Sequence, residues 1–242
     1  MTDVINSELP YLCAKLSFTG SQIGFATVLC IIGVINMIKA VFFDFDGVLT
    51  LAFSGATDVC NNLCSMYPEL DFDFVRDCYK RHIKPIIVKP GPNIEVWDEF
   101  SACIGKEVTP DAIRKLDVNE KMFDLAKSLK SNYKVGIITN QSARRIDLVR
   151  KDLNLDSIFD PIIVSAEVGV KKKDDTTKIF DIALECADCG PEEAVFIDNQ
   201  AKNLVDPGKM GFKTYWHDDS KNDIPKLCTE LERFGVICPK SF

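Results

Sequence analysis

Histidine is scarce in this chain of 242 residues, which contains only His82 and His217. Catalytic triads of the serine or cysteine type use a histidine as the base beside the nucleophile, so this sequence offers little material for them. We expect both histidines to lie at the surface or in an inserted helical segment. The sequence thus directs attention to chemistry carried by other residues.

An excess of positive charge is also absent. The formal net charge is −7, which argues against a nucleic-acid-binding surface. Internal repeats and low-complexity segments are lacking, and the hydrophobic fraction of 46% with 27% charged residues is typical of a globular protein with an ample core. The length fits one large domain, or a core with a smaller insertion.

Paired cysteine motifs are almost missing, although the chain has ten cysteines. Only Cys186 and Cys189 form a Cys-x-x-Cys, at the expected end of a helix, and a zinc site would need a second such pair. We therefore expect reduced cysteines in a cytoplasmic protein.

The first 36 residues are the least typical part of the chain. No charged residue occurs from Leu16 to Ile38, so length alone would allow a membrane span. The apolar run continues directly into a strand at Met37–Phe43, however, and the chain from Met37 onward is a complete domain by itself. We favour an extension packed on the domain, or a start site assigned too early, over a membrane anchor.

Two aspartates follow the first strand. The apolar residues Ala40–Phe43 are typical of a strand buried in a parallel sheet, and Asp44 and Asp46 leave its end as neighbours, with Gly47 allowing a turn. Ligands of open α/β sheets bind beyond this end of the strands. A magnesium ion would offset the repulsion of the two carboxylates, one of which can attack phosphorus while the other transfers a proton.

The remaining chain alternates strands with helices, apart from a helical stretch after the first strand. We predict an α/β fold with a Rossmann-like parallel sheet, formed by residues 37–51 and 119–242, and an inserted helical subdomain at 52–118. Later strands are expected at 133–140, 161–164, 194–199 and 211–216, and helices at 119–131, 142–152, 174–187 and 224–234.

Polar residues end or follow these later strands as well. Thr139 and Asn140 can hold phosphate oxygens, although such a pair also serves as a helix cap. The run Lys171–Lys173 can supply a fixed cation, although three lysines are also typical of a solvated loop. Asp198 ends an apolar strand, where an unpaired carboxylate would be costly, and it can supply a third metal oxygen.

The order Asp44/Asp46, Thr139, Lys172, Asp198 resembles motifs I to IV of the haloacid dehalogenase-like superfamily, in its phosphatase and phosphomutase branch. The similarity spans residues 37–217, and the segment 165–172 is similar to the one that carries the motif III lysine. Lys172 is the best match, while Lys171 and Lys173 stay open. The resemblance implies a Rossmann-like core, a small helical cap at about 52–118, and Mg²⁺-dependent phosphoryl transfer.

The resemblance also implies roles for single residues. Lys172 would anchor the nucleophile and the phosphate, and Thr139 and Asn140 would bind the phosphoryl group. The metal ligands would be Asp44, the carbonyl of Asp46, Asp198 and Asn199. Many relatives have a second acid where this chain has Asn199, so we expect weaker metal binding. Relatives also commonly follow the lysine with Pro-Asp-Pro, where this chain has Lys-Asp-Asp.

The sequence therefore predicts a cytoplasmic phosphatase that hydrolyses a small phosphorylated metabolite. A sugar phosphomutase of the β-phosphoglucomutase type shares all four motifs, and a non-catalytic, phosphate- or partner-binding relative is the alternative from another class. The second aspartate argues against a true dehalogenase, which needs no proton-transferring group there. The individual substrate and the oligomeric state stay open.

One basic stretch stands out in the expected cap, and most of it falls on one helix and the loop after it. It can be a solvated helix face, or some of its cations can face the active site and favour a substrate with a second anionic or polyhydroxylated end. Its members are Arg76, Lys80, Arg81, His82, Lys84 and Lys89.

Overall fold

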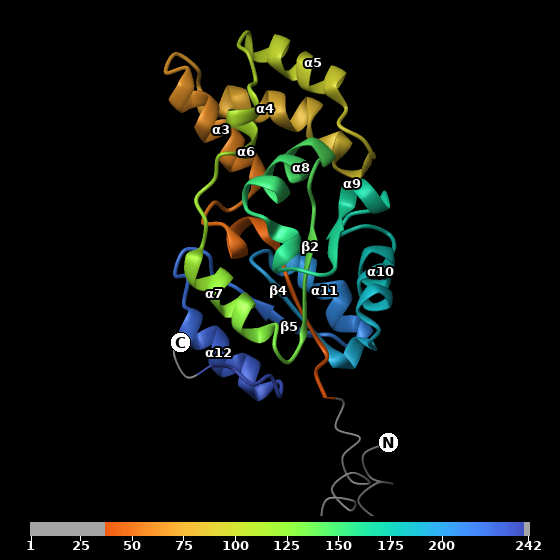
Figure 1. Ribbon diagram of the computed structural model, residues 1–242. Coiled ribbons are helices and arrows are strands. Elements are labelled where there is room, and N and C mark those ends of the chain that lie inside the picture. Colours follow the sequence, from red (N-terminus) through yellow and green to blue (C-terminus); the bar gives the residue numbers. More distant parts are fainter. Residues whose placement is uncertain (1–36, 240–242) are drawn as a thin grey trace, which may run out of the picture. The chain divides into compact units, whose positions relative to one another are not determined.

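The computed structural model describes residues 37–239, so the expectations for residues 1–36 lie outside the described part. Five parallel strands form one sheet in the order β3-β2-β1-β4-β5, which confirms the predicted α/β fold (Figure 1). No helix within the described part is long and apolar enough to cross a membrane. The strands are β1 (Ala40–Phe43), β2 (Lys134–Thr139), β3 (Ile162–Val164), β4 (Ala194–Asp198) and β5 (Lys213–Trp216).

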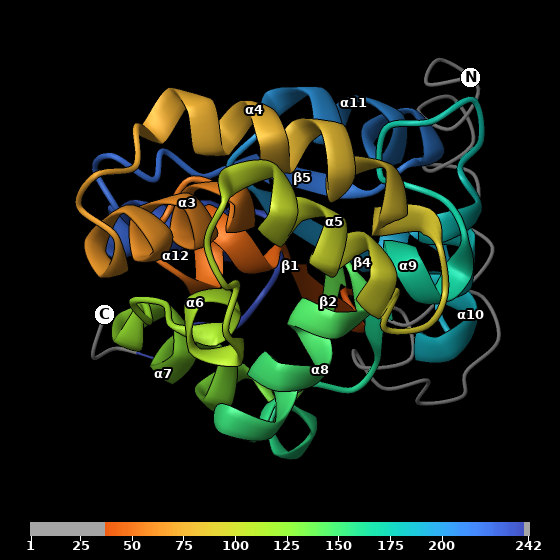
Figure 2. The same ribbon diagram turned by 90° about the horizontal axis from the view of Figure 1, so that it is seen from above.

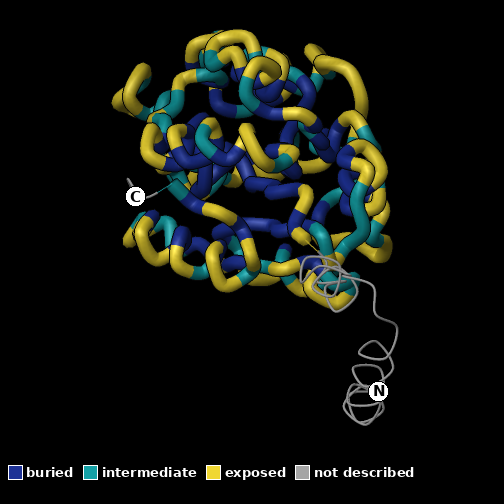
Figure 3. The backbone as a smooth tube through the Cα atoms, turned by 60° about the horizontal axis from the view of Figure 1, so that its bottom comes forward, coloured by how far each residue is buried: buried dark blue, intermediate teal, exposed yellow. Residues whose placement is uncertain are grey.

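The strand β1 lies at the centre of the sheet and is buried on both faces. Alternate side chains point to opposite faces, so Val41 and Phe43 join one hydrophobic cluster while Ala40 and Phe42 join another. This explains the continuous apolar run, because no residue of the strand faces water. Figure 3 shows buried residues in the interior of the described part and exposed residues along its outer turns.

Helices cover both faces of the sheet. The cluster around Val41 and Phe43 contains side chains from three helices on one face, and the cluster around Ala40 and Phe42 packs against two on the other. The first three are α7 (Glu120–Leu129), α8 (Ala143–Asp152) and α12 (Ile224–Arg233), and the other two are α10 (Lys178–Ala187) and α11 (Ala201–Met210). Short helical turns complete the core at η1 (Phe45–Leu49), η3 (Leu155–Ser157), α9 (Ser165–Val168) and η4 (Pro191–Glu193).

A helical segment, residues 55–114, separates η1 from α7. It has its own hydrophobic cluster, in which Tyr79, Trp97 and Phe100 meet edge to face with ring centroids 5.8–6.4 Å apart. Figures 1 and 2 show its helices gathered over one end of the sheet. They are α3 (Gly55–Met66), α4 (Phe72–His82), η2 (Lys84–Val88), α5 (Ile94–Ile104) and α6 (Pro110–Arg114).

The two connections to this helical segment run side by side. The backbone N–H of Leu51 donates to the carbonyl of Asp117 at 2.9 Å, and that of Asn119 donates to Leu49 at 2.9 Å. Both ends of the insertion are therefore fixed to each other next to the end of β1.

Two helices differ from the sequence expectation. The helix expected from Asp174 begins only at Lys178, because the Asp174 carboxylate accepts the backbone N–H groups of Lys171 and Asp175 and holds a turn there. Residues 201–210, for which no element is predicted from the sequence, form α11. Its interior contains Pro207, a residue that normally ends a helix.

Two expectations about side chains are wrong. Cys78 and Cys103 form a disulfide between α4 and α5, whereas reduced cysteines are expected from the sequence. His217 is 1% exposed and buried in the core instead of lying at the surface, and His82 lies partly exposed on α4. The remaining cysteines of the described part have free thiols, at positions 60, 64, 186, 189, 228 and 238.

Candidate active site

Asp44 and Asp46 lie just beyond the end of β1, where the chain leaves the sheet into η1. Both are buried, and Asp44 accepts the backbone N–H of Phe45 at 2.6 Å. Gly47 has φ of +75°, and a Cβ at this position would lie 2.0 Å from the amide nitrogen of Asn199. Glycine is thus required for both its conformation and the close approach of Asn199.

Lys172 joins two of the predicted carboxylates. Its ammonium lies 2.7 Å from Asp44 and 2.7 Å from Asp198, and the lysine side chain is 2% exposed. The backbone N–H of Lys172 donates to the Asn140 side chain at 3.0 Å. Lys173 instead pairs with Asp206 at the surface. Of the three lysines, Lys172 is therefore the one in contact with Asp44.

The charges of Lys172, Asp44 and Asp198 do not balance. Burial raises the pKa of Asp44 to about 8; Lys172 opposes this rise, and the Asp198 and Asp46 charges add to it. Burial alone would lower the pKa of Lys172, but the Asp198 and Asp44 carboxylates outweigh it and raise that pKa. Two carboxylates share one ammonium here, so a further cation would relieve their repulsion.

Asp198 is already well supplied with hydrogen-bond donors. Besides Lys172, it accepts the backbone N–H of Gln200 at 2.7 Å and the amide of Asn203 at 3.0 Å. The neighbouring Asn199 donates to the carbonyl of Phe53 at 3.1 Å, while its own amide oxygen is buried and has no partner among the described residues. A buried, unpaired oxygen is costly unless a cation or water meets it.

The donor set decides whether a metal ion fits. Within residues 37–239, no group of three or more histidine, cysteine, aspartate or glutamate side chains is arranged to hold a metal. The oxygen atoms present are of different kinds, namely the Asp44 carboxylate and the unpaired Asn199 amide oxygen. The backbone of Asp46 lies two residues after Asp44 and directly before Gly47, against which Asn199 packs. Such a set, with few carboxylates, matches what Mg²⁺ needs when a phosphate completes its shell.

A cavity of about 510 Å³ joins these residues to the helical segment. Asp44, Asp46 and Lys172 line it together with Thr139, the last residue of β2, and Asn140, which follows that strand. The structure thus gathers five sequence-predicted site residues around one space. Asp198 and Asn199 are not among the residues that line the cavity. Asp198 pairs with Lys172, which does, and Asn199 packs against Gly47.

Comparison with known proteins agrees with this arrangement. The family model described as haloacid dehalogenase-like hydrolase matches residues 41–216. This chain belongs to that family. No curated protein matches the sequence.

Solved structures of several haloacid dehalogenase-like (HAD-like) proteins share the fold. A predicted HAD-like family hydrolase from Porphyromonas gingivalis is 25% identical with a TM-score of 0.58, covering 81% of this chain and 98% of its own. A HAD family enzyme from Bacteroides thetaiotaomicron, in complex with magnesium and inorganic phosphate, is 22% identical with a TM-score of 0.57, covering 75% and 95%. An L-2-haloacid dehalogenase from Xanthobacter autotrophicus, with chloropropionic acid covalently bound, is 15% identical with a TM-score of 0.57, covering 83% and 85%.

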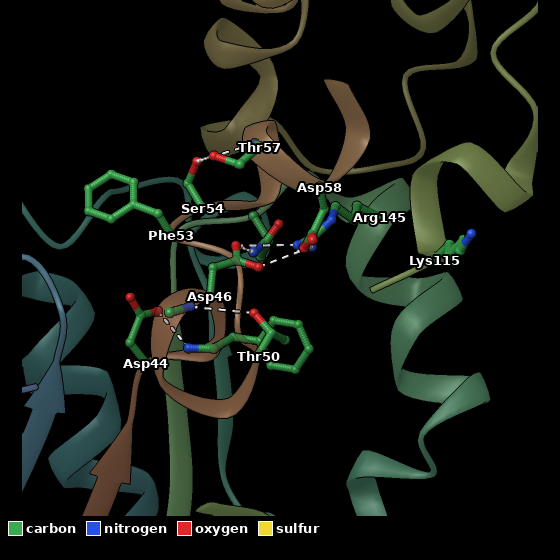
Figure 4. A network of polar contacts seen from close by, with 12 residues as sticks. Asp44, Asp46, Thr50, Phe53, Ser54, Thr57, Asp58, Lys115 and Arg145 are labelled. Atoms are coloured by element: carbon green, nitrogen blue, oxygen red, sulfur yellow. Dashed lines mark hydrogen bonds and ion pairs between the residues drawn. The ribbon is translucent and has the colours of Figure 1, made fainter. Parts of the chain in front are cut away.

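Two polar residues of this HAD-like hydrolase that were not predicted, Arg145 and Gln141, contact Asp46, and a third, Asp58, contacts Arg145. Arg145 of α8 is completely buried and pairs with Asp46 at 3.0 Å and with Asp58 of α3 at 2.9 Å (Figure 4). Gln141 also donates to the Asp46 carboxylate. A Cβ at Gly55 would lie 2.6 Å from the Arg145 guanidinium, so this glycine leaves room for the ion pair.

The position of Arg145 in its helix carries the only sequence signal for this network. Arg145 lies four residues before Val149, so an arginine stands on the buried stripe of α8. A buried arginine needs an acidic partner. Burial raises the pKa of Asp58 to about 7, against the lowering effect of Arg145, and Asp46 adds to the rise. Arg145 thus joins two acids that would repel each other without it.

Proposed function

We propose that this HAD-like hydrolase is a Mg²⁺-dependent phosphatase that hydrolyses small phosphate monoesters through a phosphorylated Asp44. The observation that carries the proposal is the buried Asp44–Lys172–Asp198 group beside Asp46, on the wall of a cavity large enough for a metabolite. The complex of the Bacteroides thetaiotaomicron relative with magnesium and inorganic phosphate supports the same chemistry.

The proposed reaction has two steps. An Asp44 carboxylate oxygen attacks phosphorus, and the alcohol oxygen leaves with a proton from Asp46. Water then attacks the phosphorus of the acyl phosphate, its proton goes to Asp46, and Asp44 and inorganic phosphate are released. Lys172 holds the attacking carboxylate in place and stabilises negative charge on the phosphoryl oxygens, to which Thr139 and Asn140 donate.

Bound Mg²⁺ would screen the repulsion between Asp44 and the phosphate. We propose that Asp44, the carbonyl of Asp46 and the Asn199 amide oxygen would hold it, with Asp198 acting on Lys172. We also propose that residues 52–118 act as a cap on a core of residues 37–51 and 119–242. Arg145 and Gln141 position Asp46 for proton transfer.

Dehalogenation fits the site less well. The Xanthobacter autotrophicus relative holds a chloropropionic acid covalently. A departing chloride needs no proton, however, whereas this chain places Asp46 in the cavity and fixes it with two donors. Proton transfer to a leaving alcohol, in contrast, would use an Asp46 carboxyl group held in this position.

The test is hydrolysis of p-nitrophenyl phosphate by full-length protein, with and without Mg²⁺. We expect Mg²⁺-dependent turnover that Asp44→Asn abolishes, because an amide does not attack phosphorus. Circular dichroism verifies that the variant is folded, and Asp175→Asn, at an exposed acid of the 171–177 turn, serves as the matched control. Hydrolysis by pure Asp44→Asn protein at the unmodified rate would refute the proposal.

A further inference from the structure

Three cations of the helical segment line the same cavity as Asp44 and Lys172. They are Arg76 and Lys80 on α4 and Lys84 at the start of η2. Phe72, Tyr79 and Ile87 of the same segment also line the cavity, as does Phe53 of the connection that leads to it. The cavity thus has two charged regions: Lys172 with its carboxylates at the strand ends, and a basic region, defined as Arg76, Lys80 and Lys84, on the helical segment.

The basic region is held over the strand ends by direct contacts. Ser165, which follows β3, donates its hydroxyl to the carbonyl of Ile87 in η2 at 2.5 Å. The same hydroxyl accepts the backbone N–H of Gln141 at 3.0 Å. Because Gln141 also contacts Asp46, the turn that carries Lys84 is linked by two hydrogen bonds to the residues around the reacting groups.

Positive charge in this region is only partly balanced. Arg76 pairs with Asp73 at 2.9 Å and Lys80 with Asp77 at 3.1 Å, but these two acids are 70% and 62% exposed and are not among the residues that line the cavity. Exposed pairs of this kind are weak and leave the cation available. Lys84 makes no ion pair within residues 37–239.

The acids that do line the cavity leave this charge unmatched. Asp44 and Asp46 are the acidic side chains of its wall, and each already pairs with a cation of the core, Lys172 or Arg145. The cations of the basic region therefore have no acidic partner across the cavity. A ligand that spans the space and ends in negative charge would supply one.

We propose that the basic region binds a second anionic group of the substrate, at the end remote from the phosphate that is cleaved. The substrate class is then a phosphate monoester that also carries a carboxylate or a second phosphate. This inference rests on the proposed phosphatase function, and it names the chemistry that selects the substrate. Substrates without the second anion leave these cations unpaired and bind less tightly.

The experiment compares substrates that differ only in the second anion. Full-length protein with Mg²⁺ is assayed on 3-phosphoglycerate against glycerol 3-phosphate and on 6-phosphogluconate against glucitol 6-phosphate, pairs in which a carboxylate replaces a hydroxymethyl group. Fructose 1,6-bisphosphate against fructose 6-phosphate tests a second phosphate. We expect kcat/KM to favour the doubly anionic member of at least one pair by about tenfold, the size of one or two charge-assisted hydrogen bonds.

Matched variants locate the effect. Lys80→Ala/Lys84→Ala should bring the ratio of the two kcat/KM values close to one, mainly through KM. Arg81→Ala and Lys89→Ala remove exposed cations of the same stretch that do not line the cavity, and they should keep the ratio of the unmodified protein. Equal kcat/KM within every pair, or equal effects of the two sets of variants, would overturn the proposal.

Binding separates this inference from the proposed reaction. Calorimetry with the same pairs in the absence of Mg²⁺, where the proposed reaction does not proceed, measures affinity without turnover. If none of these esters nor p-nitrophenyl phosphate is hydrolysed, yet the doubly anionic ligand binds more tightly and loses this advantage in Lys80→Ala/Lys84→Ala, the subsite stands and the phosphatase assignment fails.

Discussion

Asn199 is the residue that would set the affinity of the proposed site for Mg²⁺. Its amide oxygen is buried without a partner in the described part of the chain, and it lies against Gly47, next to Asp46. A neutral amide oxygen there can bind a cation but adds no charge of its own. In the proposed site, the deficit appears as a high requirement for Mg²⁺.

Asn199→Asp should therefore lower the Mg²⁺ concentration needed for half-maximal hydrolysis of p-nitrophenyl phosphate. An added charge next to a divalent ion gives a decrease of roughly tenfold, and loss of the hydrogen bond to Phe53 costs about 1 kcal/mol of stability. Asn132→Asp, at an exposed turn before β2, controls for net charge. An unchanged or higher requirement would show that Asn199 does not face the ion.

Single residues of the site could be predicted from the sequence where a strand fixes their place. Parallel strands bring their carboxyl ends to one edge, so Asp44, Thr139 and Asp198 were expected close together, and Lys172 indeed contacts Asp44 and Asp198. Arg145 could not be assigned in this way. Its partner Asp46 is 99 positions away, and the need for a buried cation appears only once α3 and α8 lie side by side.

Among the elements, α8 of the core and α3 of the helical segment are joined by a buried ion pair between Arg145 and Asp58. Arg145 is 0% exposed; its Nη2 donates to both Asp46 of η1 and Asp58 of α3, and its Nη1 also donates to Asp46. Removing one partner of such a group leaves uncompensated buried charge, which is far more costly than the loss of a surface pair.

Arg145→Met should lower the free energy of unfolding by about 3–5 kcal/mol, measured by urea denaturation. It should also lower kcat, because Asp46 loses a group that positions it. Asp58→Asn in the Arg145→Met background should recover part of the stability without recovering kcat. Arg144→Met removes the adjacent arginine, which stacks on Trp97, and should cost less than about 1 kcal/mol. Equal costs at positions 144 and 145 would contradict the role given to Arg145.

Elements were predicted well where the apolar pattern was clear and poorly where local signals conflicted. The strands β1 and β4 are short runs that are buried throughout, and all five strands were expected near their observed positions. The helix α11 was not predicted because Pro207 and Gly208, which have low helix propensity, lie inside it. The packing of Leu204 and Met210 on the core outweighs this low propensity. The Cys78–Cys103 disulfide was not predicted because the spacing of cysteines in the sequence does not show which cysteines on two different helices lie close enough to bond.

At the scale of the whole molecule, the described part of the chain begins at Met37, and the match to the family model begins at residue 41. Within the described part, three hydrophobic clusters close around the sheet and inside the helical segment. Within the described part, backbone hydrogen bonding of the sheet begins at Lys39, whose N–H donates to the carbonyl of Glu193 and whose carbonyl accepts the N–H of Lys134.

A protein that begins at Met37 should therefore fold and remain active. We expect its free energy of unfolding to lie within about 1 kcal/mol of the full-length value, since every cluster of the described part is kept. Its kcat on p-nitrophenyl phosphate should also be unchanged. A second truncation that begins at Asp44 keeps Asp44 and Asp46 but removes β1, the central strand, and should not fold, because β2 and β4 lose their shared partner. If the protein starting at Met37 aggregates, or loses activity that full-length protein shows, then residues 1–36 contribute to the fold, and the packed extension considered from the sequence is the correct description of them.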